Sequence, residues 1–179
     1  MKRESLEFDV VIIGAGPAGL SAACRLGQLA EEKGRDINVC LVEKGADVGS
    51  HILSGAVFET RALDELFPDW KERGAPVRVL VEKDSFCWLF NEHVGLNVPR
   101  LLVPKVMRNS GNYVVSLGRL CQWLGEQAEA LGCNIFSSSS ATDILYDQKG
   151  DVVGVVTGDV GLAADDTEKP NYQAGYELR

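Results

Sequence analysis

Residues 10–23 read VVIIGAGPAGLSAA, and this stretch decides the fold. A run of β-branched residues leads into the pattern Gly14-x-Gly16-x-x-Gly19, and a helix-forming segment follows. In such turns the first glycine permits a tight turn, the second leaves room for a pyrophosphate, and the third lets the helix pack on the strand. The N–H groups and the dipole at the start of the helix favour a phosphate ligand. The stretch therefore predicts a dinucleotide-binding turn.

The residues around this turn predict a βαβ unit. Residues 8–13 form a nearly continuous apolar run, which is typical of a strand buried on both faces, and residues 17–34 have helix-forming composition with a stop at Gly34. Residues 37–44, INVCLVEK, predict a second buried strand that ends near Glu43. A carboxylate at that position accepts hydrogen bonds from the ribose hydroxyls of adenosine. The alternative is a glycine-rich turn with an exposed glutamate.

Composition excludes several classes of function. The chain has 179 residues, 45% of them hydrophobic, and a net charge of -8, which disfavours nucleic acid as a partner. It has no signal peptide and no apolar stretch long enough to span a membrane, so we expect a soluble or surface-attached protein. The five cysteines are scattered without a C-x-x-C pair, which disfavours disulfides and zinc and favours a reducing compartment. Cys24 and Cys40 are expected to behave as small apolar core residues.

Residues 44–58, KGADVGSHILSGAVF, help to choose between the dinucleotides that share this half-site. The stretch is rich in glycine and serine and has no regular period. An extended segment of this kind suits a long cofactor, whereas a simple NAD domain more often continues directly into a helix and a strand. We therefore favour FAD, and the alternative is an ordinary surface loop.

The remaining chain predicts elements of mixed type. Residues 60–74 suggest a short helix that ends before Gly74, and residues 85–104 a hairpin with bulky apolar residues on both arms. Residues 116–132 have helical spacing with a stop at Gly132. Residues 134–147 and 152–161 predict strand, turn and strand, and residues 163–175 a polar loop before a final strand.

Five blocks of sequence together resemble a known family. They are DVVIIGAGPAGLSAACRLGQLA, VCLVEKGADVGSHILSGAVF, ELFPDWKERGAPV, GNYVVSLGRLCQWLGEQAEALG and GDVVGVVTGDVG. Over nearly the whole chain they are similar to the N-terminal part of electron transfer flavoprotein:ubiquinone oxidoreductases. More distantly, the chain resembles geranylgeranyl reductases and aromatic hydroxylases with the same FAD fold.

The resemblance implies an α/β, Rossmann-like FAD/NAD(P)-binding domain with a β-meander near its end. It implies that the first part of the FAD-binding domain lies in residues 1–59 and that this domain continues in residues 114–179. Residues 60–113 between them would form an α+β excursion toward the quinone and membrane side. The family's proteins are about three times longer than this chain, and GYELR at its end reads as a strand cut mid-course. We therefore expect a fragment or truncated product that holds the ADP-binding half of a FAD domain and lacks the later FAD-contacting segments.

The function implied is that of an FAD-dependent enzyme that passes electrons from reduced electron transfer flavoprotein to ubiquinone in the respiratory chain. Family members also carry a [4Fe-4S] cluster, whose cysteine ligands are not expected in this chain. The expected partners are electron transfer flavoprotein, ubiquinone and a membrane surface. The expected location is the cytoplasmic face of the inner membrane in a bacterium or the mitochondrial inner membrane in a eukaryote.

The resemblance also assigns cofactor-binding residues. The adenosine and pyrophosphate side comprises Gly14, Ala15, Gly16, Pro17, Ala18, Gly19, Glu43 and Lys44, and the stretch approaching the flavin comprises Ser50, His51, Ser54, Gly55 and Ala56. Two further positions are implied. Arg119 would contact the cofactor phosphate, and the alternative is an arginine that is simply exposed to solvent. The backbone around Ala141 would lie against the adenine. No catalytic acid or base and no metal ligand is predicted, although His51 is a candidate for tuning the flavin potential and His93 is expected to be exposed.

Residues 86–103 carry an apolar edge with two interpretations. Its members are Phe86, Trp88, Leu89, Phe90, Leu96, Val98, Leu101 and Leu102. They either enter lipid, as shallow membrane attachment in the family suggests, or pack against a further part of the protein. Two other functions remain open at this point: a different FAD enzyme that oxidises NAD(P)H or reduces a prenyl substrate, and a non-catalytic nucleotide-binding module.

Overall fold

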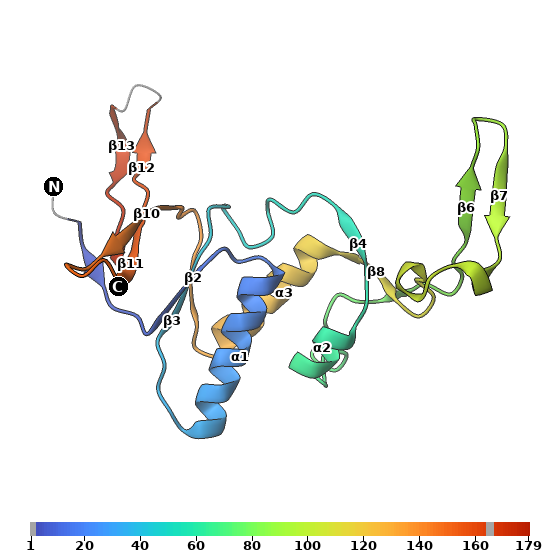
Figure 1. Ribbon diagram of the computed structural model, residues 1–179. Coiled ribbons are helices and arrows are strands. Elements are labelled where there is room, and N and C mark those ends of the chain that lie inside the picture. The colour runs from blue at the N-terminus through green and yellow to red at the C-terminus, as the bar shows by residue number, and fades with distance from the viewer. Residues whose placement is uncertain (1–2, 164–166) are drawn as a thin grey trace. The chain divides into compact units, whose positions relative to one another are not determined.

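The structure, a computed structural model, describes residues 3–163 and 167–179 and is of mixed α/β type (Figure 1). The chain divides into two compact units. The first unit combines Met1–Leu53 with Leu117–Arg179, and the second is Ser54–Ser116. The first unit contains the glycine turn.

A parallel sheet with the order β2-β3-β9 lies at the centre of the first unit. Its strands are β2 (Val10–Ile13), β3 (Val39–Val42) and β9 (Asn134–Phe136). Helix α1 (Pro17–Lys33) connects β2 to β3, and the two strands pair in parallel with Val10 opposite Val39. This confirms the predicted βαβ unit. The helix ends at Gly34, whose φ of 57° is in the left-handed region that glycine adopts without strain.

The two predicted strands of this unit differ in burial. All of β3 is buried, as its apolar run predicts. The prediction that residues 8–13 are buried on both faces is wrong, because β2 is only half-buried and Ile13 is exposed. The physical reason is position: β3 has a neighbour on each side, whereas β2 lies at the edge of the sheet.

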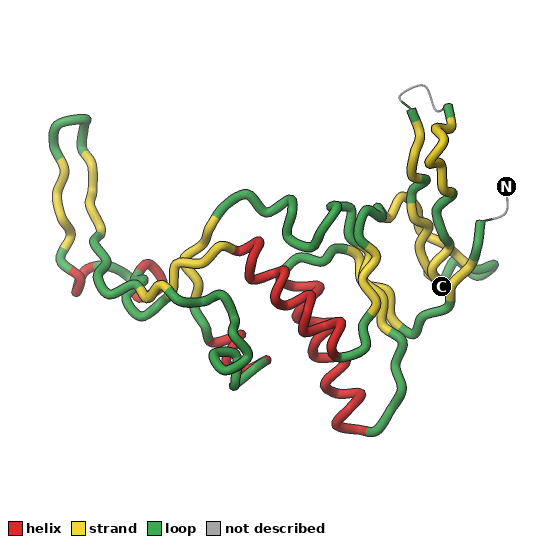
Figure 2. Tube along the Cα trace, turned by 180° about the vertical axis from the view of Figure 1, so that it is seen from behind, coloured by secondary structure: helices red, strands yellow, loops and turns green. Residues whose placement is uncertain are grey.

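Helices α1 and α3 (Leu117–Ala130) run side by side in the first unit (Figures 1 and 2). Apolar residues recur along α3 at helical spacing, and most of them are buried, as predicted. Two cysteines and two alanines take part in the packing, which lets the two helices approach closely. The buried residues of the pair include Leu20, Ala23, Cys24, Leu120, Cys121, Leu124 and Ala128.

A second sheet with the order β1-β14-β11-β10 packs on the other face of β3. Its strands are β1 (Ser5–Leu6), β14 (Glu177–Leu178), β11 (Val152–Thr157) and β10 (Ala141–Tyr146). Cys40 and Val42, which alternate with the helix-facing positions of β3, form one buried cluster with Val155 and Leu178. The core of the first unit thus lies on both sides of β3.

Three sequence-based predictions in this region are wrong. Residues 152–161 do not form one strand, because β11 ends at Thr157 and the next strand, β12, belongs to a different sheet. Residues 134–147 do not form one strand, because the chain turns at Ser138, which has a φ of 55°, and β9 and β10 then belong to different sheets. Residues 163–175 do not form a simple loop: β13 (Glu168–Gln173) pairs antiparallel with β12 (Val160–Leu162). Residues 164–166 of that predicted loop lie outside the described residues.

The second unit is built on a small sheet with the order β4-β8-β5. Its strands are β4 (Gly55–Phe58), β8 (Tyr113–Ser116) and β5 (Val79–Leu80), and its one α-helix among the described residues is α2 (Arg61–Leu66). The core contains Leu63, Phe67, Trp70, Val77 and Val115. The indole N–H of Trp70 donates to Asp64 over 2.7 Å, which fixes the ring across the end of α2.

The predicted helix over residues 60–74 is shorter than expected. It ends at Leu66, because Phe67 precedes Pro68 and has left the helical region, with φ of −136° and ψ of 85°. The predicted hairpin is confirmed as β6 (Phe86–Leu89) and β7 (Gly95–Val98), drawn in yellow-green in Figure 1. Two short 3-10 turns follow, Arg100–Leu102 and Lys105–Met107. Among the described residues, no helix has the length and apolar character that crossing a membrane requires.

Candidate functional site

The glycine turn between β2 and α1 has the geometry of a nucleotide-binding turn. Gly14 has a φ of +98°, which side chains other than glycine rarely adopt, and its N–H donates to the Val42 carbonyl over 2.8 Å. A Cβ on Gly19 would overlap the carbonyl oxygen of Gly14. The turn is therefore tied to the end of β3, and α1 approaches it as closely as glycine allows.

The start of α1 leaves room for a ligand. Gly16 caps the helix in an extended conformation, and a Cβ built on it would meet nothing within 4 Å. Within the described residues no side chain caps the N-terminus, and Pro17 occupies the first turn, where its missing N–H is not needed. The space above Gly16 and the N–H groups of the first turn together form a place for an anionic group.

Glu43 follows β3 and is joined to the glycine turn. Its Oε2 accepts a hydrogen bond from the backbone N–H of Ala15 over 2.9 Å, and its Oε1 accepts one from Gly45 over 2.7 Å. The side chain is only 14% exposed. Because each carboxylate oxygen has a second lone pair, the group can still accept hydrogen bonds from a ligand.

The segment after Glu43 is held by backbone contacts within the first unit. Ser139 donates to the Glu43 carbonyl over 2.8 Å, and Ser138 donates to the Gly45 carbonyl over 2.7 Å. Gly49, with a φ of +82°, lies so close to the backbone of Gly118 that a Cβ would meet the Gly118 carbonyl. These contacts were not found from the sequence, although a glycine just after the predicted strand over residues 37–44 is a signal of a close backbone approach.

Two polar residues of this segment lie at the surface. The side chain of His51 is 59% exposed, and its Nδ1 lies 4.0 Å from Oε1 of Glu43. Ser50 is exposed, and its N–H donates to the Asp47 carbonyl over 3.1 Å. The structure thus brings His51 beside the predicted ribose-binding carboxylate.

The other predicted cofactor residues occupy different places. Lys44 is exposed after β3, Arg119 is exposed near the start of α3, and Ala141 is half-buried at the start of β10. Ser54, Gly55 and Ala56 belong to the second unit. The prediction of an irregular segment is wrong for its end, because Gly55 and Ala56 lie in β4 and pair with β8. Their roles as cofactor contacts stay predictions.

The thiols of the first unit are buried and unreactive in character. Burial, and then the neighbouring Cys133, raise the pKa of Cys24 to about 12, and burial raises the pKa of Cys40 to about 12. Burial, and then the nearby Glu43 carboxylate, raise the pKa of Cys121 to about 11. This confirms Cys24 and Cys40 as core residues. Within residues 3–163 and 167–179 no group of three or more His, Cys, Asp or Glu side chains is placed to hold a metal ion.

Comparison with known families and structures agrees with this geometry. Residues 12–67 match the model of the NAD(P)-binding Rossmann-like domain. A geranylgeranyl bacteriochlorophyll reductase-like protein from Thermoplasma acidophilum superposes with a TM-score of 0.63 at 16% identity, over 97% of this chain and 37% of that one. The myxobacterial FAD-dependent halogenase CndH gives a TM-score of 0.57 at 20% identity, over 96% and 36%. The fold is thus the Rossmann-like fold found in FAD-dependent oxidoreductases.

In sequence, the chain is similar to one particular enzyme of that class. The electron transfer flavoprotein-ubiquinone oxidoreductase of Pseudomonas aeruginosa is 56% identical over 100% of this chain and 33% of its own length. Other curated relatives with this name are 48 to 52% identical over 99% of the chain. The resemblance that the sequence blocks indicated is confirmed. The chain spans about a third of the length of the curated relatives it matches.

Proposed function

We propose that the chain is the FAD-binding part of an oxidoreductase that passes electrons from reduced electron transfer flavoprotein to ubiquinone. The observation that carries this proposal is the extent of the identity, 56% over 100% of the chain. The family model alone covers residues 12–67, which many dinucleotide-binding proteins share. The second unit, with its hairpin, is part of the same continuous match.

The glycine turn supports FAD as the cofactor. The residues fit a pyrophosphate, because Gly16 leaves open space beside the start of α1 and Gly14 and Gly19 let backbone segments meet without side chains. Glu43 would accept hydrogen bonds from the adenosine ribose, and Lys44 and Ala141 would lie along the adenosine side. When bound, FAD supplies the redox chemistry, taking up and releasing electrons singly.

At the adenosine end of the site, the backbone of this chain orients the carboxylate of Glu43. With Ala15 and Gly45 each donating to one oxygen, the carboxylate cannot rotate freely, so its remaining lone pairs point in fixed directions. A preorganised acceptor loses less entropy when a ribose binds. His51 lies next to this carboxylate. In the proposal, Ser50, His51, Ser54, Gly55 and Ala56 are the residues that approach the flavin.

The second unit supports the proposed partners. In the hairpin β6–β7, Trp88 is 58% exposed, and Leu89, Phe90 and Leu96 are also exposed. Exposed apolar side chains on a strand pair favour contact with lipid, where ubiquinone is dissolved. We therefore place the protein at a membrane surface, the cytoplasmic face of the inner membrane in a bacterium or the inner mitochondrial membrane in a eukaryote. The proposed [4Fe-4S] cluster would have its ligands outside this sequence.

The test is an electron-transfer assay on the protein encoded by the full open reading frame. Reduced electron transfer flavoprotein is supplied as donor and a soluble ubiquinone analogue as acceptor. The proposal expects quinone reduction that depends on the flavoprotein donor. Oxidation of NAD(P)H, or reduction of a prenyl substrate without that donor, would instead assign the chain to another FAD enzyme of the same fold.

A further inference from the structure

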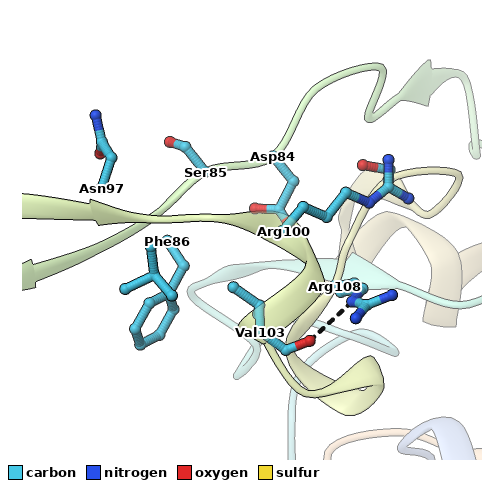
Figure 3. Close-up of a pocket in the computed structure, with 9 residues that line it drawn as sticks. Asp84, Ser85, Phe86, Asn97, Arg100, Val103 and Arg108 are labelled. Carbon is cyan, nitrogen blue, oxygen red and sulfur yellow. Dashed lines mark hydrogen bonds between the residues drawn. The ribbon is translucent and has the colours of Figure 1, made fainter.

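A small cavity in the second unit lies at the base of the hairpin β6–β7 and has a volume of about 120 Å³. This is room for several water molecules or one small anion. Figure 3 shows the side chains around it, with the two guanidinium groups extending to the same side. The polar residues that line it are Asp84, Ser85, Asn97, Arg100, Arg108 and Ser110.

The cavity carries a positive charge in a chain that is acidic overall. Arg100, Lys105 and Arg108 are the only charged residues between positions 99 and 110, whereas the net charge of the chain is -8. Within the cavity, two guanidinium groups face one carboxylate, Asp84. One oxygen of Asp84 accepts the Asn109 N–H over 2.6 Å. The excess of positive over negative charge at this site favours an anionic ligand.

One of the two arginines is already oriented by the backbone. Nε of Arg108 donates to the Val103 carbonyl over 2.9 Å, as Figure 3 shows, and Nη2 lies 3.5 Å from the Leu101 carbonyl. The guanidinium is therefore held in place while part of its donor edge remains for a ligand. Arg100 is exposed, and its guanidinium extends to the same side as that of Arg108 in Figure 3. Two arginines in this arrangement match the oxygens of a phosphate group.

Apolar side chains alternate with these cations along the same segment. Leu101 is 87% exposed, Leu102 is 72% exposed and Val106 is 94% exposed, although each is a large hydrophobic residue. Arg100 and Lys105 directly precede Leu101 and Val106. Exposed aliphatic residues between cations are typical of segments that lie in a membrane interface, with the aliphatic groups in the acyl region and the cations at the headgroups.

We propose that the cavity between Arg100 and Arg108 binds the phosphate of an anionic phospholipid headgroup while Leu101, Leu102 and Val106 contact the acyl chains. The hydroxyls of Ser85 and Ser110 donate further hydrogen bonds to the phosphate. The inference rests on the membrane contact in the proposed function and adds to it a lipid class and a defined subsite. Charge complementarity and the adjoining apolar residues select a lipid over a free anion.

The experiment is flotation of the protein from the full reading frame with two kinds of vesicle at constant ionic strength, phosphatidylcholine alone and phosphatidylcholine mixed with phosphatidylglycerol. The wild-type protein is expected to prefer the mixed vesicles. Arg100→Gln is expected to reduce that preference roughly fivefold, and Arg100→Gln with Arg108→Gln more strongly. Asp84→Asn is expected to increase it, because the substitution removes the one competing carboxylate.

A matched control removes charge elsewhere in the same unit. Arg61→Gln with Arg78→Gln deletes two exposed arginines that do not line the cavity and should leave the preference unchanged. Circular dichroism and thermal melting establish that the variants are folded, and Arg108→Lys, which keeps the charge, should retain most of the preference. A double cavity variant that floats like wild type, or a control pair that loses the preference equally, would overturn the proposal.

Further outcomes separate this inference from the proposed function. If wild-type protein binds neutral and anionic vesicles equally, the headgroup subsite is wrong and membrane attachment stands. If it binds neither, membrane attachment fails together with the subsite. Inorganic phosphate and glycerol phosphate are each added as competitors to protein bound to the mixed vesicles. If inorganic phosphate displaces the protein as effectively as glycerol phosphate does, the cavity is a free-anion site, which also overturns the inference.

Discussion

The backbone N–H of Ala15 donates to Oε2 of Glu43 over 2.9 Å, which joins the glycine turn after β2 to the carboxylate after β3. The two residues are 28 positions apart in the sequence. In the proposed function Glu43 has two tasks, because the carboxylate that fixes the conformation of the turn would also accept hydrogen bonds from the ribose. The adenosine end of the site is therefore one connected unit.

Replacing Glu43 by Gln should weaken FAD binding by roughly tenfold or more, because a charged hydrogen bond contributes about 1.5–3 kcal/mol and the amide nitrogen cannot accept one. Titration of the apoprotein with FAD, followed by flavin fluorescence, measures the change. Glu31→Gln, an exposed residue near the end of α1, is the matched control. Equal affinity in wild type and the Glu43 variant would remove Glu43 from the site.

Two glycines of the turn should respond differently to the same substitution. Gly19→Ala places a Cβ on the Gly14 carbonyl and should lower the free energy of unfolding by about 1–3 kcal/mol. The Cβ of Gly16→Ala meets open space, so this substitution should lower the free energy of unfolding by less than about 1 kcal/mol, the scale of a change at a helix cap. It should nevertheless greatly weaken FAD binding. Urea unfolding and FAD titration on both variants separate the two effects. Unimpaired FAD binding by Gly16→Ala would show that no pyrophosphate approaches that position.

The buried thiols predict alkaline destabilisation. The folded pKa values of Cys24 and Cys40 are raised to about 12 from an ordinary value of 9.0. Above the ordinary value the unfolded chain ionises first and binds fewer protons than the folded one, so the free energy of unfolding should fall as pH rises from about 9 toward 12. Cys40→Val should flatten this decline. A pH series of urea unfolding curves measures it, and an identical slope in the variant would contradict the assignment.

Leu178 should be a major contributor to the stability of the first unit. It is 1% exposed and belongs to the cluster of Cys40, Val42 and Val155, which joins the two sheets. Leu178→Ala should lower the free energy of unfolding by about 2–5 kcal/mol, because apolar burial is lost and a cavity is left behind. Ile144→Ala, in the half-exposed strand β10, should cost much less. If thermal melting shows a comparable loss of stability in the Leu178 and Ile144 variants, this packing is wrong.

Two aromatic residues of the hairpin should govern membrane attachment. Trp88→Ser with Phe90→Ser removes two exposed rings from β6 and its turn and should reduce flotation with neutral and anionic vesicles alike. The substitutions should not affect FAD content, which serves as the control for folding. Unchanged flotation would favour packing of this edge against another part of the protein.

Replacing His51 by Ala tests whether the imidazole next to Glu43 affects the flavin. A charged or polar group near the cofactor shifts its electron affinity, so the variant should have a different flavin midpoint potential while retaining FAD. Potentiometric titration of wild type and variant measures the shift. An unmoved midpoint would end the proposed tuning role.

The sequence predicts the local features of this fold well. The glycine pattern, the alternation of strand and helix, and the stop residues Gly34 and Gly132 are local signals, and each element has the expected type in the structure. The buried cysteines of α1 and β3 were likewise predicted from the apolar pattern around them.

Some of the features that the sequence missed depend on residues far apart in the chain, and one has the composition of a loop. The separation of β9 from β10 follows from the left-handed Ser138 and from parallel pairing with β3, neither of which has a local signature. Strand β13 is polar and contains Pro170, so its composition resembles a loop. The bond from Ala15 to Glu43 required the parallel register of β2 and β3 to be known.

Flavin absorbance of the protein from the full reading frame is the most direct test of the proposed electron transfer. Reduced electron transfer flavoprotein is added without oxygen, and a ubiquinone analogue follows. We expect a bound flavin spectrum that bleaches with the first addition and recovers with the second. A protein without flavin, or a flavin that NAD(P)H reduces and electron transfer flavoprotein does not, would contradict it.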